Sequence, residues 1–153
     1  MRVAFALGSN VGDSRRILTD AVADLIERGG LAGARRSPFY RTAPWGVTDQ
    51  SDFLNLVLVA ESDRAPDDLL ALGHSLEDEA GRVRTVVNGP RTLDVDLLAV
   101  GDLVIAEPGL TLPHPRAHER GFVLVPWNDV DPGFVLPGHG RVADLAAAID
   151  RSG

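Results

Sequence analysis

The sequence contains no cysteine and no lysine. Without cysteine, the chain can form no disulfide and no thiolate nucleophile, which fits the reducing cytoplasm. Without lysine, it can have no P-loop lysine, no Schiff-base lysine and no protein-kinase strand lysine. All 15 basic residues are arginine, so a phosphate group would have to be bound by guanidinium groups, backbone N–H groups or metal ions.

Long apolar runs and net positive charge are also absent. No apolar run reaches the roughly 20 residues of a membrane-spanning helix, and residues 1–8 are too short and wrongly flanked for a signal peptide. The formal net charge is −7, whereas general nucleic-acid binding needs a basic surface. We therefore expect a cytoplasmic protein that binds neither membranes nor nucleic acids, with a local group of arginines if its substrate is anionic.

What is present indicates a single domain over residues 1–153. The apolar fraction of 44% and the charged fraction of 24% are ordinary for a globular protein. Apolar periodicity predicts strands at 3–7, 34–42, 53–60 and 93–100, and helices that begin near Ser14 and at Pro66. The order strand, helix, strand, strand, helix, strand (βαββαβ) is typical of an α+β, ferredoxin-like sandwich.

The remaining residues, about 50 of them, form a C-terminal extension. Gly101 and Asp102 predict a hairpin turn into a strand at 103–105. Pro115 can start a short helix that places Arg116 and Arg120 one turn apart. We expect residues 129–139 to form a surface segment rich in proline and glycine, and residues 142–149 to form a helix.

Asp94 and Asp96 are the most informative pair of residues. In a strand, side chains two residues apart share a face, so both carboxylates should project opposite Val95 and Leu97. Paired acids on an apolar strand are costly to bury without a positive partner. They could hold Mg²⁺, which prefers carboxylate oxygens, or they could lie at an exposed strand end beside arginines. The spacing alone leaves both interpretations open.

Several other polar residues have two interpretations. Arg82 and Arg84 follow the expected helix end and could complement its dipole or, with Arg91, clamp an anion. His114 precedes two aligned arginines and could be structural or bind phosphate. Residues 8–12 predict mainly a strand-to-helix turn, with lining of a substrate cleft as the alternative.

Two stretches could contact a flat ligand. Phe53 and Asn55 should share one face of their strand, where a ring can stack and an amide can bind the edge of a heterocycle. Asn55 could equally bond a neighbouring loop. Trp45 lies in a stretch of loop composition and could cover a flat substrate or anchor a small satellite core.

Taken together, these residues resemble the 6-hydroxymethyl-7,8-dihydropterin pyrophosphokinase family along nearly the whole chain. The most specific segment is Gly89–Asp96, with the sequence Gly-Pro-Arg-Thr-Leu-Asp-Val-Asp. The other matching stretches are residues 6–12, 39–42 through 53–55, 81–84, and 112–116 through 120–122. Because these segments occur in one order, the resemblance favours magnesium at Asp94 and Asp96.

The resemblance implies an ATP-dependent transferase that moves pyrophosphate from ATP to the hydroxymethyl oxygen of the pterin in folate biosynthesis, releasing AMP. We expect Asp94 and Asp96 to hold two Mg²⁺ ions, and Arg82 and Arg91 to be catalytic cations. The substrates would be ATP and 6-hydroxymethyl-7,8-dihydropterin, and we expect a monomer. The expected ATP-binding residues are Glu77, Arg84, His114, Arg116 and Arg120. The expected pterin-binding residues are Thr42, Pro44, Trp45, Gly46, Phe53, Asn55 and Phe122.

The chain also departs from the family pattern. Many relatives have tryptophan before the Gly-Pro-Arg motif, where this chain has Asn88, and Phe53 stands where tyrosine is common. We hypothesise that Trp45 partly replaces the missing tryptophan. Two rival functions remain at this level: a metal-dependent nucleotide phosphohydrolase, which needs no stacking site, and a ferredoxin-like binding module, which leaves the paired acids unexplained.

Overall fold

The computed structural model describes residues 1–10, 13–42, 53–81 and 92–149. The helices are α1 (Ser14–Gly29), α2 (Pro66–Gly81), α3 (Gly121–Val130), α4 (Val142–Ala148) and the 3₁₀ turn η1 (Ala117–Glu119). The strands are β1 (Arg2–Ser9), β2 (Ala32–Arg36), β3 (Tyr40–Thr42), β4 (Phe53–Glu61), β5 (Asp94–Val100), β6 (Ile105–Glu107), β7 (Leu110–Leu112), β8 (Val135–Leu136) and β9 (Gly140–Arg141). Among the helices in these ranges, none combines the length and apolar character that crossing a membrane requires.

An antiparallel sheet in the order β2-β4-β1-β5 forms the centre of the molecule. The predicted order of strands and helices is found, with one difference. The expected strand at 34–42 is two strands, and both β2 and β3 pair with β4. Ser37 lies at the break, where its N–H donates to the Val57 carbonyl and its hydroxyl accepts from the Val57 N–H. Pro38 follows and cannot donate to a ladder, which is consistent with the break.

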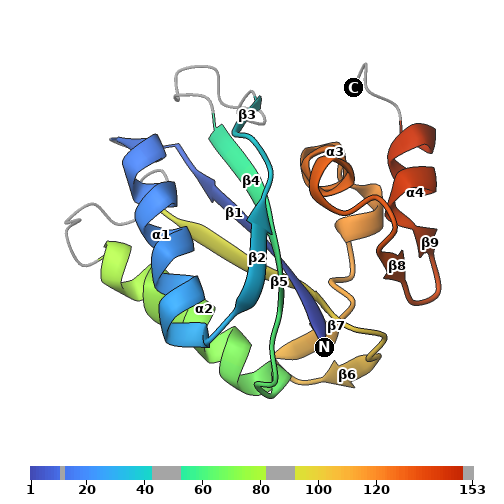
Figure 1. Ribbon diagram of the computed structural model, residues 1–153, viewed down its shortest axis with the longest axis horizontal. Coiled ribbons are helices and arrows are strands. Elements are labelled where there is room, and N and C mark those ends of the chain that lie inside the picture. Colours follow the sequence, from blue (N-terminus) through green and yellow to red (C-terminus); the bar gives the residue numbers. More distant parts are fainter. Residues whose placement is uncertain (11–12, 43–52, 82–91, 150–153) are drawn as a thin grey trace.

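The two faces of the sheet are covered by different helices (Figure 1). Helices α1 and α2 cover one face, and their apolar stripes form the larger core with the side chains of β1, β4 and β5. Asp13 caps α1 by accepting from the Arg16 N–H, as the sequence allows. Helices α3 and α4 lie on the opposite face, where the fully buried Trp127 centres a second core.

Strand β1 divides its side chains by size between these two cores. Val3, Phe5 and Leu7 point to the α1–α2 face and are buried in the larger core. Ala4 is buried in the second core, and Ala6 packs against it. Because successive strand residues alternate faces, Ala4, Ala6 and Gly8 leave little side-chain volume on the α3 side of the central strand. A hollow can therefore form there without a break in the sheet.

The C-terminal extension differs most from the sequence predictions. The turn at Gly101 exists, with a positive φ of 54°, but β6 pairs with β7 and not with β5. The helix expected at Pro115 is the single turn η1. Residues 129–139 are not merely surface, because Phe134 and Leu136 are buried in the second core. Helix α3 was not predicted, whereas the C-terminal helix is confirmed as α4.

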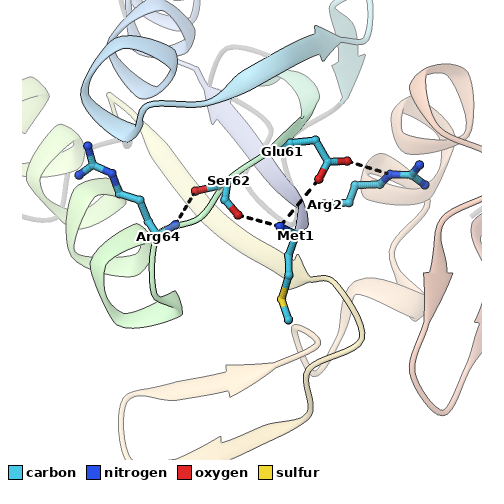
Figure 2. Close-up of polar contacts among 5 residues, drawn as sticks. All are labelled: Met1, Arg2, Glu61, Ser62 and Arg64. Atoms are coloured by element: carbon cyan, nitrogen blue, oxygen red, sulfur yellow. Dashed lines mark hydrogen bonds and ion pairs between the residues drawn. The ribbon is translucent and has the colours of Figure 1, made fainter.

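The start of β1 is tied to the end of β4 by polar contacts (Figure 2). The Met1 nitrogen donates to the Ser62 carbonyl at 2.8 Å and lies 3.8 Å from Glu61. Arg2 lies 3.9 Å from Glu61 and 3.3 Å from the buried carboxylate of Asp131 at the end of α3. These contacts hold the sheet and α3 together at the end of β1 opposite Gly8.

Candidate active site

A cavity of about 210 Å³ lies on the α3 face of the sheet, where β1 presents its small residues. It is lined by Ala6, Leu7, Gly8, Thr42, Phe53, Asn55, Leu56, Asp94, Asp96, Arg120 and Phe122. Seven of these are residues that the sequence singled out as metal, ATP or pterin contacts: Thr42, Phe53, Asn55, Asp94, Asp96, Arg120 and Phe122. Five separate parts of the chain therefore meet in one hollow, which we call the first cavity.

Asp94 and Asp96 project into the first cavity from β5. Both are partly buried, while Val95 and Leu97 are buried in the larger core on the other face, as the alternation predicted. In the register of the sheet, Asp94 stands opposite Gly8. The carboxylates therefore form one wall of the hollow.

The opposite wall comes from β4. Asn55 stands across Gly8 from Asp94, and its amide N–H₂ donates to the Thr42 hydroxyl on β3. Phe53 also lines the cavity, so the predicted shared face is confirmed. Asn55 bonds the neighbouring strand β3, where the alternative interpretation expected a loop, and it also lines the cavity. A Cβ at Gly8 would lie 3.0 Å from the Asn55 side-chain oxygen, so glycine permits this close approach.

Arg120 and Phe122 close the first cavity from the side of α3. Arg120 lies between η1 and α3, and its N–H donates to the Ala117 carbonyl at 3.3 Å. Its guanidinium carbon lies 5.6 Å from the centre of the Phe122 ring. Phe122 is 37% exposed, which is unusual for a large apolar side chain and leaves a ring face open to a ligand.

A second cavity of about 420 Å³ adjoins the first, and Asp96 lines both. It is lined by Leu70, His74, Glu77, Val95, Asp96, Leu97, Gly109, Leu110, Thr111, His114 and Pro115. Glu77 and His114 are the expected ATP contacts found here. Among the described residues, Asp96 is the one that the linings of the two cavities have in common.

Glu77 has a direct contact with the strand that carries the acids. Its carboxylate accepts the Val95 N–H at 2.8 Å. Burial raises the pKa of the Glu77 carboxyl, the Val95 hydrogen bond lowers it, and the charges of Asp94 and Asp96 raise it further. Negative charge is thus concentrated at this end of β5, a condition that a divalent cation would relieve.

The surroundings of His114 favour the neutral form of its imidazole by lowering its pKa. Burial lowers the pKa of its imidazole, Asp96 opposes this effect, and Arg120 and Arg116 add to it. Its Nδ1 accepts the Arg116 N–H at 3.2 Å, so in the neutral ring the proton is on Nε2. The ring can therefore donate a hydrogen bond from Nε2 to an anionic oxygen. Arg116 itself is exposed and lines neither cavity.

Some of the predicted site residues lie outside the described ranges. These are the pterin contacts Pro44, Trp45 and Gly46, and the cations Arg82, Arg84 and Arg91. Asn88 and residues 11–12 lie outside them as well. Of the stretch at 8–12, Gly8 belongs to β1 and lines the first cavity.

The sequence analysis did not predict eight of the residues that line the second cavity, among them Leu70, His74, Leu97 and Thr111. A signal existed for two of them, because Leu70, His74 and Glu77 are spaced four and three apart on α2 and so share a helix face. Nothing in the sequence indicated that Leu97 lines a cavity, because the alternation of side chains along β5 predicts that Leu97 points into the core. Thr111 lies on β7, a strand that the sequence did not predict.

The donor set fits Mg²⁺ in part. Among the described residues, no three histidine or acidic side chains are grouped as a complete metal site. Mg²⁺, however, is commonly bound by one or two carboxylates together with water and substrate phosphates. Asp94 and Asp96, which line one cavity with Arg120 beside them, match that kind of incomplete site.

The fold and the first cavity define a protein of mixed helix and sheet whose paired acids and aromatic rings face one hollow. Residues 4–132 match the family 7,8-dihydro-6-hydroxymethylpterin-pyrophosphokinase (HPPK). The chain belongs to this family, whose members transfer pyrophosphate from ATP to hydroxymethyldihydropterin in folate biosynthesis.

Curated relatives agree with this assignment. The chain is 40% identical over 152 residues to 2-amino-4-hydroxy-6-hydroxymethyldihydropteridine pyrophosphokinase of Methylorubrum extorquens, covering 99% of this chain and 96% of that protein. It is 42% identical over 161 residues to the protein of the same name from Mycobacterium leprae, covering 98% and 80%.

Solved structures show a similar fold. A Plasmodium falciparum HPPK-DHPS variant with pterin and p-hydroxybenzoate matches with a TM-score of 0.71 at 14% identity, covering 95% of this chain and 43% of that one. The wild-type protein with pteroate matches with a TM-score of 0.67. The chain thus spans about two fifths of those longer chains, and the likeness concerns the fold.

Proposed function

We propose that the two cavities divide the substrates of pyrophosphate transfer between them. The pterin occupies the first cavity, the nucleoside of ATP occupies the second, and the triphosphate crosses between them. The observation that carries this proposal is that Asp96 lines both cavities. A residue shared by two sites is where a phosphate chain reaching from one to the other would be held.

The chemistry of the first cavity supports the pterin assignment. Phe53 and Phe122 offer ring faces for stacking, and Asn55 offers an amide for the heterocycle edge. Because the Asn55 amide donates to Thr42, its side-chain oxygen remains directed toward Gly8 and the cavity. The volume of about 210 Å³ is below the roughly 300–1,000 Å³ of drug-sized pockets and suits a small ring system.

The second cavity supports the nucleotide assignment. Leu70, Leu97 and Leu110 supply apolar surface, and Thr111 and His74 supply polar groups at its edge. His114 would donate from Nε2 to a phosphate oxygen. Arg120 would neutralise charge on the transferred group from the first cavity, with Arg82, Arg84, Arg91 and Arg116 as further proposed phosphate contacts.

We propose that Asp94 and Asp96 hold two Mg²⁺ ions together with the triphosphate. Bound Mg²⁺ would neutralise phosphate charge and align the triphosphate for in-line displacement. The carboxylates orient these ligands, and Glu77 keeps the acids in place through its bond to the Val95 N–H. The raised pKa of Glu77, which burial and the neighbouring acids cause, is consistent with a site built for added positive charge.

In the reaction, the hydroxymethyl oxygen of the pterin forms a bond to the β-phosphorus of ATP. The bond from that phosphorus to the oxygen bridging to the α-phosphate breaks, AMP leaves, and the hydroxyl proton passes to solvent. The residues contribute position and charge, which is the main requirement of phosphoryl transfer. No nucleophilic side chain is needed.

The arrangement of the core supports a ferredoxin-like assignment, because β1, α1, β2, β4, α2 and β5 follow the βαββαβ pattern. We propose a single domain that acts as a monomer in the cytoplasm. The absence of cysteine motivates the location, and these three statements stay predictions.

The direct test is to incubate the chain with ATP, Mg²⁺ and 6-hydroxymethyl-7,8-dihydropterin and to measure AMP and pterin diphosphate. We expect both products in equal amounts and no AMP when the pterin is left out. AMP released equally without pterin would instead indicate a nucleotide phosphohydrolase.

Asp96→Asn tests the shared position. The substitution removes the negative charge of Asp96, which lines both cavities, and should lower kcat about 100-fold or more. The matched control is Asp102→Asn, an exposed acid on the turn after β5, which should leave kcat unchanged. Equal activity of Asp96→Asn and the wild-type chain would contradict the proposal.

A further inference from the structure

Two histidine rings are stacked between η1 and the hairpin of β8 and β9. The ring centres of His118 and His139 lie 3.8 Å apart, and the ring planes differ by 11°. His118 lies in the middle of η1, and His139 lies on the turn between β8 and β9. The stack therefore joins two segments that are 21 residues apart in sequence (139 − 118).

The turn η1 separates two residues of the active site. On one side, the His114 N–H donates to the Leu98 carbonyl of β5 at 2.8 Å. On the other side, Arg120 reaches the first cavity. Within the turn, the Glu119 backbone N–H donates to the Arg116 carbonyl at 3.0 Å. A single 3₁₀ turn has few hydrogen bonds of its own, so its position depends on what packs against it.

Packing against η1 comes from two sides. Ala117 is buried in the second core, which fixes one side of the turn. His118 points to the hairpin, and its ring is held by the stack more than by hydrogen bonds. Its buried Nδ1 has no hydrogen-bond partner among the described residues, and its Nε2 lies 3.5 Å from the Glu119 carboxylate.

We propose that His139 is a positioning residue for pyrophosphate transfer, which acts through His118 to hold η1 and thereby keeps Arg120 in the active site. This inference rests on the proposed role of Arg120 at the triphosphate. Leu136 of β8 is buried in the second core. This burial anchors the hairpin of β8 and β9 that carries His139.

The experiment compares two substitutions at His139. His139→Phe keeps a ring that can stack on His118, whereas His139→Ala removes the ring. The control is Val135→Ala, which changes a side chain that is 56% exposed on the same hairpin. For each chain, kcat and the KM values for ATP and pterin are measured, with circular dichroism as a check of folding.

We expect His139→Ala to raise the KM for ATP about two- to tenfold, while the control keeps the wild-type value. His139→Phe should keep the wild-type KM, because its ring can still stack on His118. An unchanged KM in His139→Ala, or an equal rise in His139→Phe, would overturn the inference. If His139→Ala is unfolded, His139→Leu, which fills the space without a ring, takes its place in the comparison.

The outcome for the wild-type chain separates this inference from the proposed function. If the wild-type chain releases no pterin-dependent AMP, the proposed function fails and the inference fails with it. If it releases AMP normally while the KM for ATP of folded His139→Ala matches that of the wild-type chain, only the inference fails.

Discussion

Gly8 controls the width of the first cavity because it lets Asn55 approach the central strand. A Cβ added at Gly8 would lie 3.0 Å from the Asn55 side-chain oxygen, which is too close for the amide to stay where it is. Glycine at this position is thus explained by a contact and not by the backbone, since β1 is an ordinary strand here.

We predict that Gly8→Ala weakens pterin binding and leaves the nucleotide largely unaffected. The amide of Asn55 must move by a few tenths of an ångström, so a hydrogen bond to the pterin edge is weakened. The KM for pterin should rise about two- to tenfold, while the KM for ATP stays within about twofold.

Gly133→Ala is the matched control, because a Cβ there would meet no atom within 4 Å. It should leave both KM values unchanged. An equal rise in the two KM values of Gly8→Ala would indicate general distortion of the site and count against the assignment of the pterin to this cavity.

The raised pKa of Glu77 should make the stability of the chain depend on pH when neither metal nor nucleotide is bound. Burial raises the pKa of its carboxyl above the ordinary value of 4.5. A group whose folded-state pKa is raised contributes stability below its unfolded pKa and loses that contribution as the pH rises through the folded pKa. The ionised Glu77 of neutral solution is therefore less favourable in the folded chain than the protonated form.

We predict that Glu77→Gln raises the melting temperature of the chain at pH 8 by about 1–2 °C, after allowance for solvent screening. The gain should be smaller at pH 5 because wild-type Glu77 is then partly protonated. Melting curves in EDTA measure this effect. Activity should fall, since Glu77 lines the second cavity.

Asp78→Asn is the control for the Glu77 experiment, because it removes the neighbouring charge from an exposed position on α2. It should show no such difference between pH 5 and pH 8. A lower melting temperature of Glu77→Gln at pH 8 would mean that the bond to the Val95 N–H outweighs burial.

At the scale of elements, α3 has separate tasks at its two ends. Its first turn carries Phe122 into the first cavity. Its other end is anchored to the start of β1, where Asp131 lies 3.3 Å from Arg2. A helix of 10 residues is about 15 Å long, so changes at the anchor should be separable from changes at the site.

We predict that Asp131→Asn lowers the melting temperature by about 2–4 °C, which corresponds to about 1 kcal/mol. The Asp131 side chain is only 9% exposed, so the substitution removes the shorter and more buried of the two ion pairs that Arg2 forms among the described residues, and the exposed pair with Glu61 at 3.9 Å remains. Both KM values should stay at wild-type levels.

Asp129→Asn, an exposed change two residues earlier on α3, should leave the melting temperature unchanged and serves as the control. If Asp131→Asn instead altered the KM for pterin as strongly as its stability, the two ends of α3 would not be independent.

The elements that could be predicted from the sequence are those with one apolar face. Helices α1 and α2 have apolar stripes and clear ends, and β1, β4 and β5 have long apolar runs. Helix α3 was missed because its residues are apolar on nearly every side, with Pro126 inside it. Such a run lacks helical periodicity, and its burial between the sheet and α4 depends on tertiary packing that a sequence does not display.

At the scale of the whole molecule, the position of the site follows from the unequal use of the two sheet faces. The α1–α2 face receives the large side chains of β1 and is filled. The α3 face receives Ala4, Ala6 and Gly8, and the first cavity lies there. The second cavity is lined by Glu77 of α2 and by Val95 and Leu97, whose side chains belong to the other face. The proposed site therefore draws on both sides of β5.

The residues of the site could be named from the sequence more readily than their arrangement. Asp94, Asp96, Phe53 and Asn55 stood out because they are polar or aromatic residues at particular strand positions. The sequence could not predict that Asp96 lines two cavities. The second cavity is formed by residues of β7 and of one face of α2, and their packing around Asp96 is a feature of the tertiary structure. The stack of His118 on His139 likewise depends on a hairpin without a periodic pattern.

The most direct test of the central claim is a crystal structure with Mn²⁺ in place of Mg²⁺, α,β-methylene-ATP and 6-hydroxymethyl-7,8-dihydropterin. We predict anomalous density for the metal at the carboxylates of Asp94 and Asp96, the pterin ring between Phe53 and Phe122, and the nucleoside in the second cavity. Metal bound away from both carboxylates, or a pterin outside the first cavity, would contradict the account.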